Sequence, residues 1–370
     1  MLKKIILLLI FSLSISAIAQ QYQFKPVVDL EASSVKSQGR SGTCWSFSTS
    51  SFLESEIYRI NHKNVDIAEM YIVRTTYDKK AWNYVMRQGK IQFGEGGLAH
   101  DVIHAVAKDG LVPQSAFTDI FGNDKIYDHS KVVPAVKKIL DSYIKNDIHS
   151  DYPNWRKAID SILDQQIGIK PREFVFDNQT FTPKSFAAYL KIKPEDYISI
   201  TSFTHEKPYT KFVLNIPDNF SNGSFYNLPL DQFVSVTVNA LKKGFTVALD
   251  VDVSEKGFSA RYGLAVIPNN PDELEKSFTE IVPEKKITPE YRQREFENYN
   301  TTDDHLMHIT GLVKDQKGNL YFKVKNSWGS NSARVGNNGY IYMSIPYFKL
   351  KAISILLHKD ALDSNLKIVE

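Results

Sequence analysis

The only cysteine in this 370-residue chain, Cys44, lies where a thiol can become a nucleophile. It follows the loop QGRSGT, in which Gly39 and Gly42 allow a tight turn, and an amphipathic segment begins at the cysteine. We expect a helix to start here, with Ser41 or Thr43 as its cap, so that free backbone N–H groups and the positive dipole end favour the thiolate. Such a thiolate is suited to acyl transfer, although a buried structural cysteine at a helix start would have the same neighbours.

A nucleophilic thiol of this kind needs a base, and the segment HLMHITGLV offers His305 and His308. Their odd spacing on a strand directs the two rings to opposite faces of a sheet, so only one can face a cleft. An asparagine follows in KVKNSWGS, where alternation places Val324 and Asn326 on the same, inward side. A buried amide needs a hydrogen-bond partner, which a histidine can supply; an ordinary strand end beside a core tryptophan, Trp328, is the alternative.

Three of these segments together resemble the papain-like cysteine peptidases, peptidase family C1. The shared features are Gln38 six residues before Cys44, the run GTCW around the cysteine, and the run NSWG that begins at Asn326. The chain departs from the family pattern at Ser41, which replaces a cysteine, and at Thr43, which replaces a small residue. The first departure removes a disulfide and leaves the chemistry intact.

The resemblance implies a role for each of these residues. Cys44 is expected to be the nucleophile, and His305, which opens its strand as the family's histidine does, is expected to be the base; an exchange of roles with His308 stays open. Asn326 would accept the Nδ1 proton of the imidazole, which leaves Nε2 directed at the sulfur, and Trp328 would shield that bond from water. The Gln38 amide would help the Cys44 backbone N–H to hold the oxyanion.

A second group of candidates lies in FGEGGLAHDVIHAVAKDG. Gly96 and Gly97 resemble the glycine pair that runs alongside bound substrate in the family, and we place them with Trp45 and Trp328 among the substrate-binding residues. A plain helix-entry turn is the alternative. His100 and His104 have the i, i+4 spacing of a zinc helix, but the glutamate base and a third ligand are missing, so we expect no metal site.

Hydrophobic patterning divides the chain into a helix-rich part and a strand-rich part. Helical spacing covers residues 43–60, 99–108 and 133–165; strand-like alternation covers 244–253, 305–315, 319–328 and 339–345, with a hairpin turn at 316–319 and a charged loop and surface helix over 254–304. We predict an α+β, papain-like two-lobed fold: an N-terminal helical lobe, a C-terminal antiparallel β-barrel-like lobe, and an active-site cleft between them. No linker divides the chain. The expected bounds are 1–19 for a signal peptide, 20–370 for one peptidase domain, about 35–240 for the helical lobe with an insertion at about 120–235, about 241–362 for the β lobe, and 363–370 for a short tail.

The first twenty residues, MLKKIILLLIFSLSISAIAQ, predict a signal peptide cleaved after Ala19. A membrane anchor is the alternative, but the apolar run from Ile5 to Leu13 is short for a span. We expect export to a periplasm or to the outside, with no integral membrane anchor after cleavage. Removing Lys3 and Lys4 lowers the formal net charge of +3 by two to +1, which gives no reason to expect a nucleic-acid partner.

The resemblance is closer to one branch, the bleomycin hydrolases and aminopeptidases C. It spans nearly all of the mature chain, including the insertion between the lobes, and the segments from TFTPKSF to ARYGLAV resemble that branch in order and spacing. Members of that branch are aminopeptidases that commonly form hexameric rings, and their C-terminal carboxylate lies in the cleft and reads the substrate amine. The tail ending at Glu370 is shorter here, and we expect it not to reach Cys44. We predict an exported cysteine aminopeptidase that acts on peptides without a cofactor; a papain-like endopeptidase and a catalytically silent peptide-binding protein are the alternatives.

Overall fold

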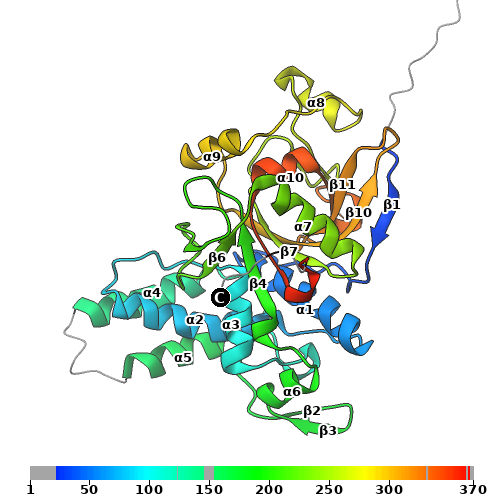
Figure 1. The fold of residues 1–370 in the computed structure, drawn as a ribbon. Helices are drawn as coiled ribbons and strands as arrows, with labels where there is room; N and C mark the ends of the chain where they lie inside the picture. Colours follow the sequence, from blue (N-terminus) through cyan, green and yellow to red (C-terminus); the bar gives the residue numbers. More distant parts are fainter. Residues whose placement is uncertain (1–21, 123, 146–153, 331, 364–365, 367–370) are drawn as a thin grey trace, which may run out of the picture.

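The computed structural model describes residues 22–122, 124–145, 154–330, 332–363 and 366. The predicted signal peptide at 1–19 and most of the predicted tail at 363–370 lie outside these ranges, as does the expectation about Glu370. None of the helices within the described ranges is both long and apolar enough to cross a membrane. Figure 1 shows the helices of the first half on one side and the main sheet with its own helices on the other.

Helix α1 spans Cys44–Asn61, close to its predicted range, and lies between the other helices and the sheet (Figure 1). The Thr43 side chain does not cap it; its hydroxyl lies 2.6 Å from the hydroxyl of Ser41, so the expected cap was wrong. The predicted helical segment 133–165 is two helices. The further elements of this half are α2 (Glu69–Met86), α3 (Ala99–Asp109), η1 (Gln114–Ala116), α4 (Val132–Lys145), α5 (Asn154–Gln166), the hairpin of β2 (Phe174–Phe176) and β3 (Gln179–Phe181), α6 (Pro183–Tyr189) and η3 (Pro194–Asp196).

The main sheet has eleven strands in the described part of the chain. Its order is β5-β6-β4-β13-β7-β10-β11-β12-β9-β8, and β1 pairs with β10. The predicted hairpin joins β10 to β11. The bounds are β1 (Lys25–Asp29), β4 (Tyr197–Thr201), β5 (Lys211–Val213), β6 (Ser224–Asn227), β7 (Val247–Val251), β8 (Phe258–Ser259), β9 (Leu264–Ala265), β10 (His305–Lys314), β11 (Leu320–Lys325), β12 (Tyr340–Ser344) and β13 (Ala352–His358).

This sheet corrects two expectations. It is open and not barrel-like: the outermost strands, β5 and β8, do not pair with each other in the described ranges, and β4/β6 and β12/β9 are parallel pairs. Strands β4, β5 and β6 also come from the insertion at 120–235, which the sequence placed with the helical lobe. Every residue of β4 is buried, so its pattern has no alternation to distinguish a strand from a buried helix segment.

The two faces of the sheet belong to different hydrophobic cores. Ala248 and Leu306 pack into the core that surrounds α1, whereas Leu249 and Met307 pack into the core beneath α7 and α10. Adjacent residues of β7 and β10 therefore face opposite lobes, as strand alternation requires. The remaining helices are α7 (Leu230–Lys242), η4 (Pro271–Glu273), α8 (Leu274–Ser277), α9 (Pro289–Glu297), η5 (Asn337–Gly339), α10 (Ile345–Lys351) and η6 (Lys359–Ala361).

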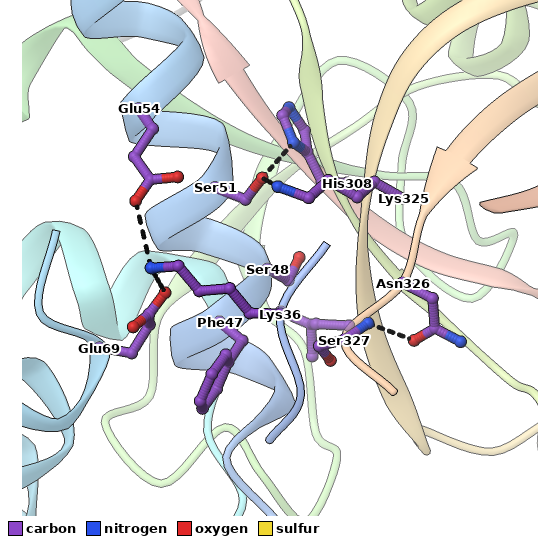
Figure 2. Close-up of a pocket in the computed structure, with 11 residues that line it drawn as sticks. Lys36, Phe47, Ser48, Ser51, Glu54, Glu69, His308, Lys325, Asn326 and Ser327 are labelled. Atoms are coloured by element: carbon purple, nitrogen blue, oxygen red, sulfur yellow. Dashed lines mark hydrogen bonds and ion pairs between the residues drawn. The ribbon is translucent and has the colours of Figure 1, made fainter. Parts of the chain in front are cut away.

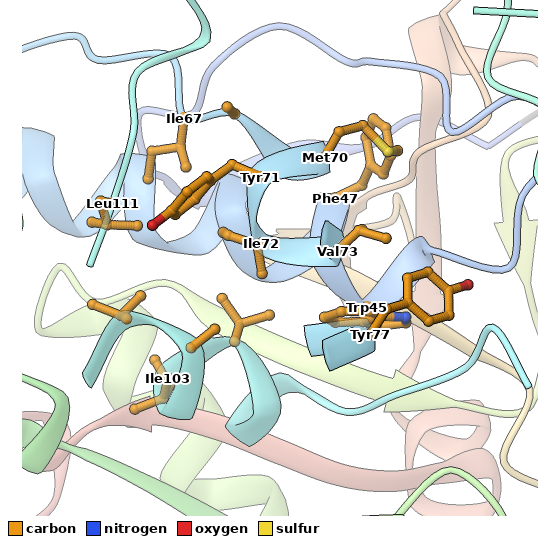
Figure 3. Packing of buried hydrophobic residues seen from close by; sticks show 14 of the residues in the cluster. Trp45, Phe47, Ile67, Met70, Tyr71, Ile72, Val73, Tyr77, Ile103 and Leu111 are labelled. Atoms are coloured by element: carbon orange, nitrogen blue, oxygen red, sulfur yellow. The ribbon is translucent and has the colours of Figure 1, made fainter. Parts of the chain in front are cut away.

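The start of α1 is held by the core of the helical lobe. Trp45 and Phe47 of α1 pack beside Met70 and Val73 of α2, and Ile103 of α3 belongs to the same cluster (Figure 3). Because these side chains are almost completely removed from water, α1 cannot turn about its axis without opening the core. The residue before Trp45, Cys44, is thereby fixed in position.

Arg74 of α2 ties α2 to α5 through a fully buried guanidinium. Its Nη1 contacts Asp78 at 2.7 Å, and its Nη2 contacts Asp160 at 2.8 Å and Asp164 at 2.9 Å.

Arg74→Met is expected to lower the free energy of unfolding by about 2–3 kcal/mol. This loss is smaller than the full cost of breaking a buried ion pair, because the three carboxylates stay partly hydrated. Urea denaturation measures this loss. Lys137→Met, which breaks an exposed pair with Asp141, should cost less than about 1 kcal/mol, and an equal loss in both variants would contradict the prediction.

Glu284 should make stability depend on pH. Its Oε2 accepts hydrogen bonds from the Ile267 N–H at 2.7 Å and the Ser344 hydroxyl at 2.6 Å, and burial raises its pKa to about 7. Because the folded pKa exceeds the unfolded one of about 4.3, ionisation disfavours the fold, and stability falls as the pH rises from about 4.3 to 7. Glu284→Gln should therefore raise the melting temperature at pH 8 and leave it unchanged at pH 4. The exposed Glu275→Gln is the control, and a gain that does not vary with pH would refute the prediction.

Candidate active site

Cys44 is the first residue of α1 and is 8 % exposed. The backbone N–H of Leu306 is close enough to the sulfur to favour its anion, which brings the thiol to the start of β10, next to His305. Burial nevertheless raises the pKa of the Cys44 thiol to about 12. The sequence predicted the opposite direction because it considered the helix end and not the loss of solvent around the sulfur.

His305 and Asn326 form the hydrogen bond that the sequence predicted, but through the other ring nitrogen. His305 Nε2 lies 2.8 Å from Asn326 Oδ1, whereas Nδ1 had been expected in this place. Since the amide oxygen accepts, Nε2 carries the proton, and Nδ1 is left with a free lone pair. The Trp328 ring lies over the imidazole with the centroids 4.7 Å apart, as expected of a shield from water.

The thiol and the imidazole are each uncharged when taken alone. Burial lowers the pKa of His305 to about 4, against the opposing effect of its bond to Asn326, and it raises that of the thiol. Moving the proton from the sulfur to Nδ1 leaves the net charge of the pair unchanged, so mutual attraction compensates part of the desolvation. No hydrogen bond joins the Cys44 sulfur to His305 in the described structure. A thiolate–imidazolium pair therefore requires the two side chains to approach each other.

Gln38 is locked at the junction of the two lobes. Its Nε2 donates to the Ser41 carbonyl at 2.6 Å, and its Oε1 accepts from the Ser327 hydroxyl at 2.7 Å. Its backbone N–H donates to the Ser327 carbonyl at 2.9 Å, and the Gly329 N–H donates back to the Lys36 carbonyl at 3.0 Å. These bonds leave one amide hydrogen of Gln38 available for an oxyanion beside the start of α1.

The glycine pair lies against Trp45, but Gly96 is not open to an extended substrate. A side chain on Gly97 would come within 3.1 Å of the Trp45 indole, whose N–H donates to the Glu95 carbonyl at 3.0 Å. Trp45 is 1 % exposed, so it supports the glycines from below and presents almost no surface to a ligand. The Gly96 carbonyl accepts a hydrogen bond from Lys80 Nζ, and the carboxylate of Asp218 covers the space beside Gly96.

His308 faces away from His305, as the odd spacing predicted, and belongs to a separate polar network. Its Nδ1 lies 2.9 Å from Ser51 Oγ of α1, and Lys325 Nζ donates to the same hydroxyl at 2.7 Å (Figure 2). Burial lowers the pKa of Lys325 to about 8 and that of His308 well below its usual value. His308 is therefore a neutral residue of the interface between β10 and α1.

A small cavity of about 10 Å³ lies between this network and Asn326 (Figure 2). It is lined among others by Ser48, whose hydroxyl has no partner, and the Asn326 Nδ2 likewise has no partner in the described structure. A volume of this size can hold about one water. The Ser327 N–H donates to Asn326 Oδ1 at 2.7 Å and thereby holds the amide in the orientation that presents this oxygen to His305 (Figure 2).

The HDVIH segment does not gather metal ligands. His100 Nε2 lies 3.0 Å from the Ser221 hydroxyl and His104 Nδ1 3.4 Å from Lys79 Nζ, so both rings have structural partners. Glu54, Asp66 and Glu69 form a separate cluster whose carboxylates lie close enough together to hold a metal ion. Lys36 Nζ contacts all three carboxylates and supplies their positive charge.

The fold agrees with the comparisons to known proteins. The profile of the Peptidase C1-like family matches residues 90–369, and that of the papain family cysteine proteases matches residues 25–142. Since the first match covers most of the chain, the chain belongs to the Peptidase C1-like family. It is a cysteine-type peptidase.

Individual relatives match over nearly the whole chain. Aminopeptidase C of Streptococcus thermophilus is 23% identical over 381 residues, which cover 91% of this chain and 83% of the relative. Aminopeptidase C of Lactobacillus delbrueckii subsp. lactis is 23% identical over 386 residues, which cover 92% and 82%. The crystal structure of PepW from Lactobacillus rhamnosis HN001 superposes with a TM-score of 0.75 at 18% identity, covering 93% of this chain and 84% of that one. The papain-like fold is thereby confirmed.

Proposed function

We propose that the protein is a cysteine aminopeptidase in which Cys44 is the nucleophile, His305 the base and Asn326 the residue that orients the base. The observation that carries this proposal is the 2.8 Å contact between His305 Nε2 and Asn326 Oδ1 at the start of β10, next to the N–H of Leu306 that acts on the Cys44 sulfur. Binding alone requires no such arrangement, which argues against a catalytically silent protein.

The chemistry follows from the atoms present. His305 Nδ1 takes the thiol proton, and the sulfur attacks the carbonyl carbon of the peptide bond. The oxyanion that forms would be held by the Cys44 backbone N–H and the free amide hydrogen of Gln38. The imidazolium then gives its proton to the leaving amine, and an acyl-enzyme remains. In the second half of the reaction, deacylation, His305 takes a proton from a water molecule. The water oxygen attacks the thioester, and the acyl group leaves Cys44.

The preference for a free amino terminus is supported by the relatives, which are named aminopeptidases, and by the covered Gly96. A peptide bound in extended form would pair with this glycine, but Asp218 occupies the space beside it and Lys80 Nζ already donates a hydrogen bond to its carbonyl. Only a short part of the substrate can then lie on the amino-terminal side of the cleaved bond. An endopeptidase would need that side to be open.

Two measurements test this function. E-64 should label wild-type protein and leave Cys44→Ala unlabelled. Peptides of equal sequence with free and with acetylated amino termini should be cleaved at rates that differ by at least about 10-fold in favour of the free form. Equal cleavage of both would reject the aminopeptidase assignment and leave a peptidase, whereas absence of labelling and of cleavage would favour the silent binding protein.

We further propose that the chain is exported and that its first 19 residues are removed, because they combine two lysines, a short apolar run and small residues before Ala19. The protein should then be recovered from the periplasm or the medium with Gln20 as its first residue. Amino-terminal sequencing of the native protein tests this. An intact Met1 on protein in the cytoplasm would refute it.

A further inference from the structure

Three carboxylates meet beside Cys44 in addition to the residues already assigned. Asp303 lies two positions before His305, Asp250 is the residue of β7 paired with Leu306, and Asp218 lies in the loop between β5 and β6. Asp250 and Leu306 are directly opposite on neighbouring strands, so their side chains share the face that looks toward α1. All three carboxylates are near enough to the sulfur to raise the pKa of Cys44.

Two of these carboxyls have oxygens without a hydrogen-bond partner. Asp250 is 3 % exposed; its Oδ2 accepts from the Ser354 hydroxyl at 3.2 Å, whereas its Oδ1 is unpartnered. Neither oxygen of Asp303 completes a hydrogen bond of normal geometry, although both are shielded from water; the polar groups nearest to them are the Asp250 carboxyl and the Asp218 N–H. Buried carboxylate oxygens without donors are costly, and they indicate a missing partner.

Of the three carboxyls, Asp303 has no cation among the groups that act on it most strongly. Lys80 acts on Asp218, and the buried guanidinium of Arg292 lies near Asp250. Burial and the neighbouring Asp303 nevertheless raise the pKa of Asp250 well above its usual value, so this carboxyl keeps its proton. Burial and the nearby Asp218 raise the pKa of Asp303 to about 7, which means that no cation of the described residues compensates it. One further positive charge at this place would ionise Asp303 and supply its oxygens with donors.

The loop that carries Asp218 is anchored firmly enough to form one wall of a site. The Asn83 side chain of α2 donates to the Phe220 carbonyl at 2.7 Å, and the Ser221 hydroxyl lies 3.0 Å from His100 of α3. Within the loop, Asn219 Nδ2 donates to the Leu214 carbonyl at 2.8 Å. These bonds hold the Asp218 carboxylate over Gly96, at the end of the path that an extended substrate would follow.

Resting on the proposed aminopeptidase function, we propose that Asp303, together with Asp218 and Asp250, binds the N-terminal ammonium group of the substrate. An ammonium offers three N–H donors to the unpartnered oxygens and a positive charge next to Asp303, on which no cation acts strongly. The amine of an N-terminal residue lies two bonds, about 2.5 Å, from the carbonyl carbon that the sulfur attacks, so its binding site must adjoin Cys44. The substrate amine is then bound by the side chains of Asp303, Asp218 and Asp250.

The test uses Asp303→Asn in the full-length protein, with Asp304→Asn as a matched control. Asp304 is exposed and hydrogen-bonded to the Ser254 N–H and the Thr302 hydroxyl, so the control removes the same charge one residue away. Asp303→Asn should lower kcat/KM for leucyl-aminomethylcoumarin by about 10- to 100-fold, mainly through KM, the usual effect of losing a charged hydrogen bond. Asp304→Asn should change it less than about 3-fold.

The acetylated substrates separate this site from other possibilities. Hydrolysis of acetyl-leucyl-aminomethylcoumarin, and the rate at which iodoacetamide alkylates Cys44, should not fall in Asp303→Asn. An equal loss for free and acetylated substrates would overturn the proposal, because Asp303 would then support the chemistry itself. An equal loss for acetyl-arginyl-leucyl-aminomethylcoumarin would overturn it in favour of a pocket for a cationic side chain.

Failure of the proposal is distinguishable from failure of the proposed function. If wild-type protein cleaves acetylated and free substrates equally well, the aminopeptidase assignment fails before any variant is made. If wild-type protein prefers free amines and Asp303→Asn keeps that preference unchanged, only the ammonium site is wrong. Asp218→Asn provides a second variant on an independent loop, and it should show the same selective loss if Asp303→Asn folds poorly.

Discussion

Cys44→Ala is expected to lower kcat/KM for peptide hydrolysis by at least about 10⁴-fold, with little change in melting temperature. The sulfur forms the covalent bond to the substrate in the proposed mechanism, and no other cysteine exists in the chain to replace it. The variant removes one buried atom at the first turn of α1, where the surrounding core is formed by larger side chains. Initial rates on an unblocked peptide and thermal denaturation followed by circular dichroism measure the two quantities.

Ser50→Ala is the matched control for this change. Ser50 lies in the same helix, is fully buried and has a hydroxyl without a partner, so the variant also removes one buried atom from α1. Its activity should remain within about 2-fold of wild type. Residual activity above about 1 % in Cys44→Ala, after mass spectrometry has excluded contaminating wild-type protein, would contradict the assignment of the nucleophile.

His305→Ala should lower kcat by about 10³- to 10⁴-fold, whereas His308→Ala should lower stability and leave kcat within a few-fold of wild type. His305 is bonded to Asn326 beside the thiol, and His308 is bonded to Ser51 on the opposite face of β10. Losing the bond between His308 and Ser51 would leave the buried Ser51 hydroxyl with one partner fewer, at a cost of about 1–3 kcal/mol. Steady-state kinetics and urea denaturation of both variants measure these effects.

The two histidine variants also test the exchange of roles that the sequence alone left open. An inactive but stable His308→Ala, with an active His305→Ala, would assign the base to His308 and reject the proposed site. If both variants lost activity together with their folded structure, Asn326→Ala would be the next variant to compare. It should lower kcat by about 10- to 100-fold, because the imidazole would lose the group that orients it.

The residues of the site were predictable from the sequence because each is tied to a local pattern. Cys44 follows a glycine loop and begins an amphipathic helix, and Asn326 is followed closely by a tryptophan at the end of an alternating strand. The odd spacing of His305 and His308 correctly placed them on opposite faces. Spacing of this kind depends on helix and strand geometry alone, so it needs no knowledge of the tertiary structure.

The parts that were missed depend on contacts between distant segments. Whether Nε2 or Nδ1 of His305 meets Asn326 is decided by the rotation of one ring, and the raised pKa of Cys44 is decided by how completely the lobes close around it. Asp303 stands two positions before the predicted histidine and was within reach of sequence reasoning. Asp250 and Asp218 were not, because only the pairing of β7 with β10 and the anchoring of a loop from the insertion bring them there.

The backbone hydrogen bonds at Gln38 hold the two lobes together next to the proposed site. Backbone hydrogen bonds from Gln38 to Ser327 and from Gly329 to Lys36 join the segment before the proposed nucleophile to the segment after Asn326, as neighbouring strands of a sheet are joined. The two halves of the centre cannot separate without breaking these bonds. The resting enzyme is therefore already assembled, and turnover needs side-chain adjustment, not a hinge motion of whole lobes.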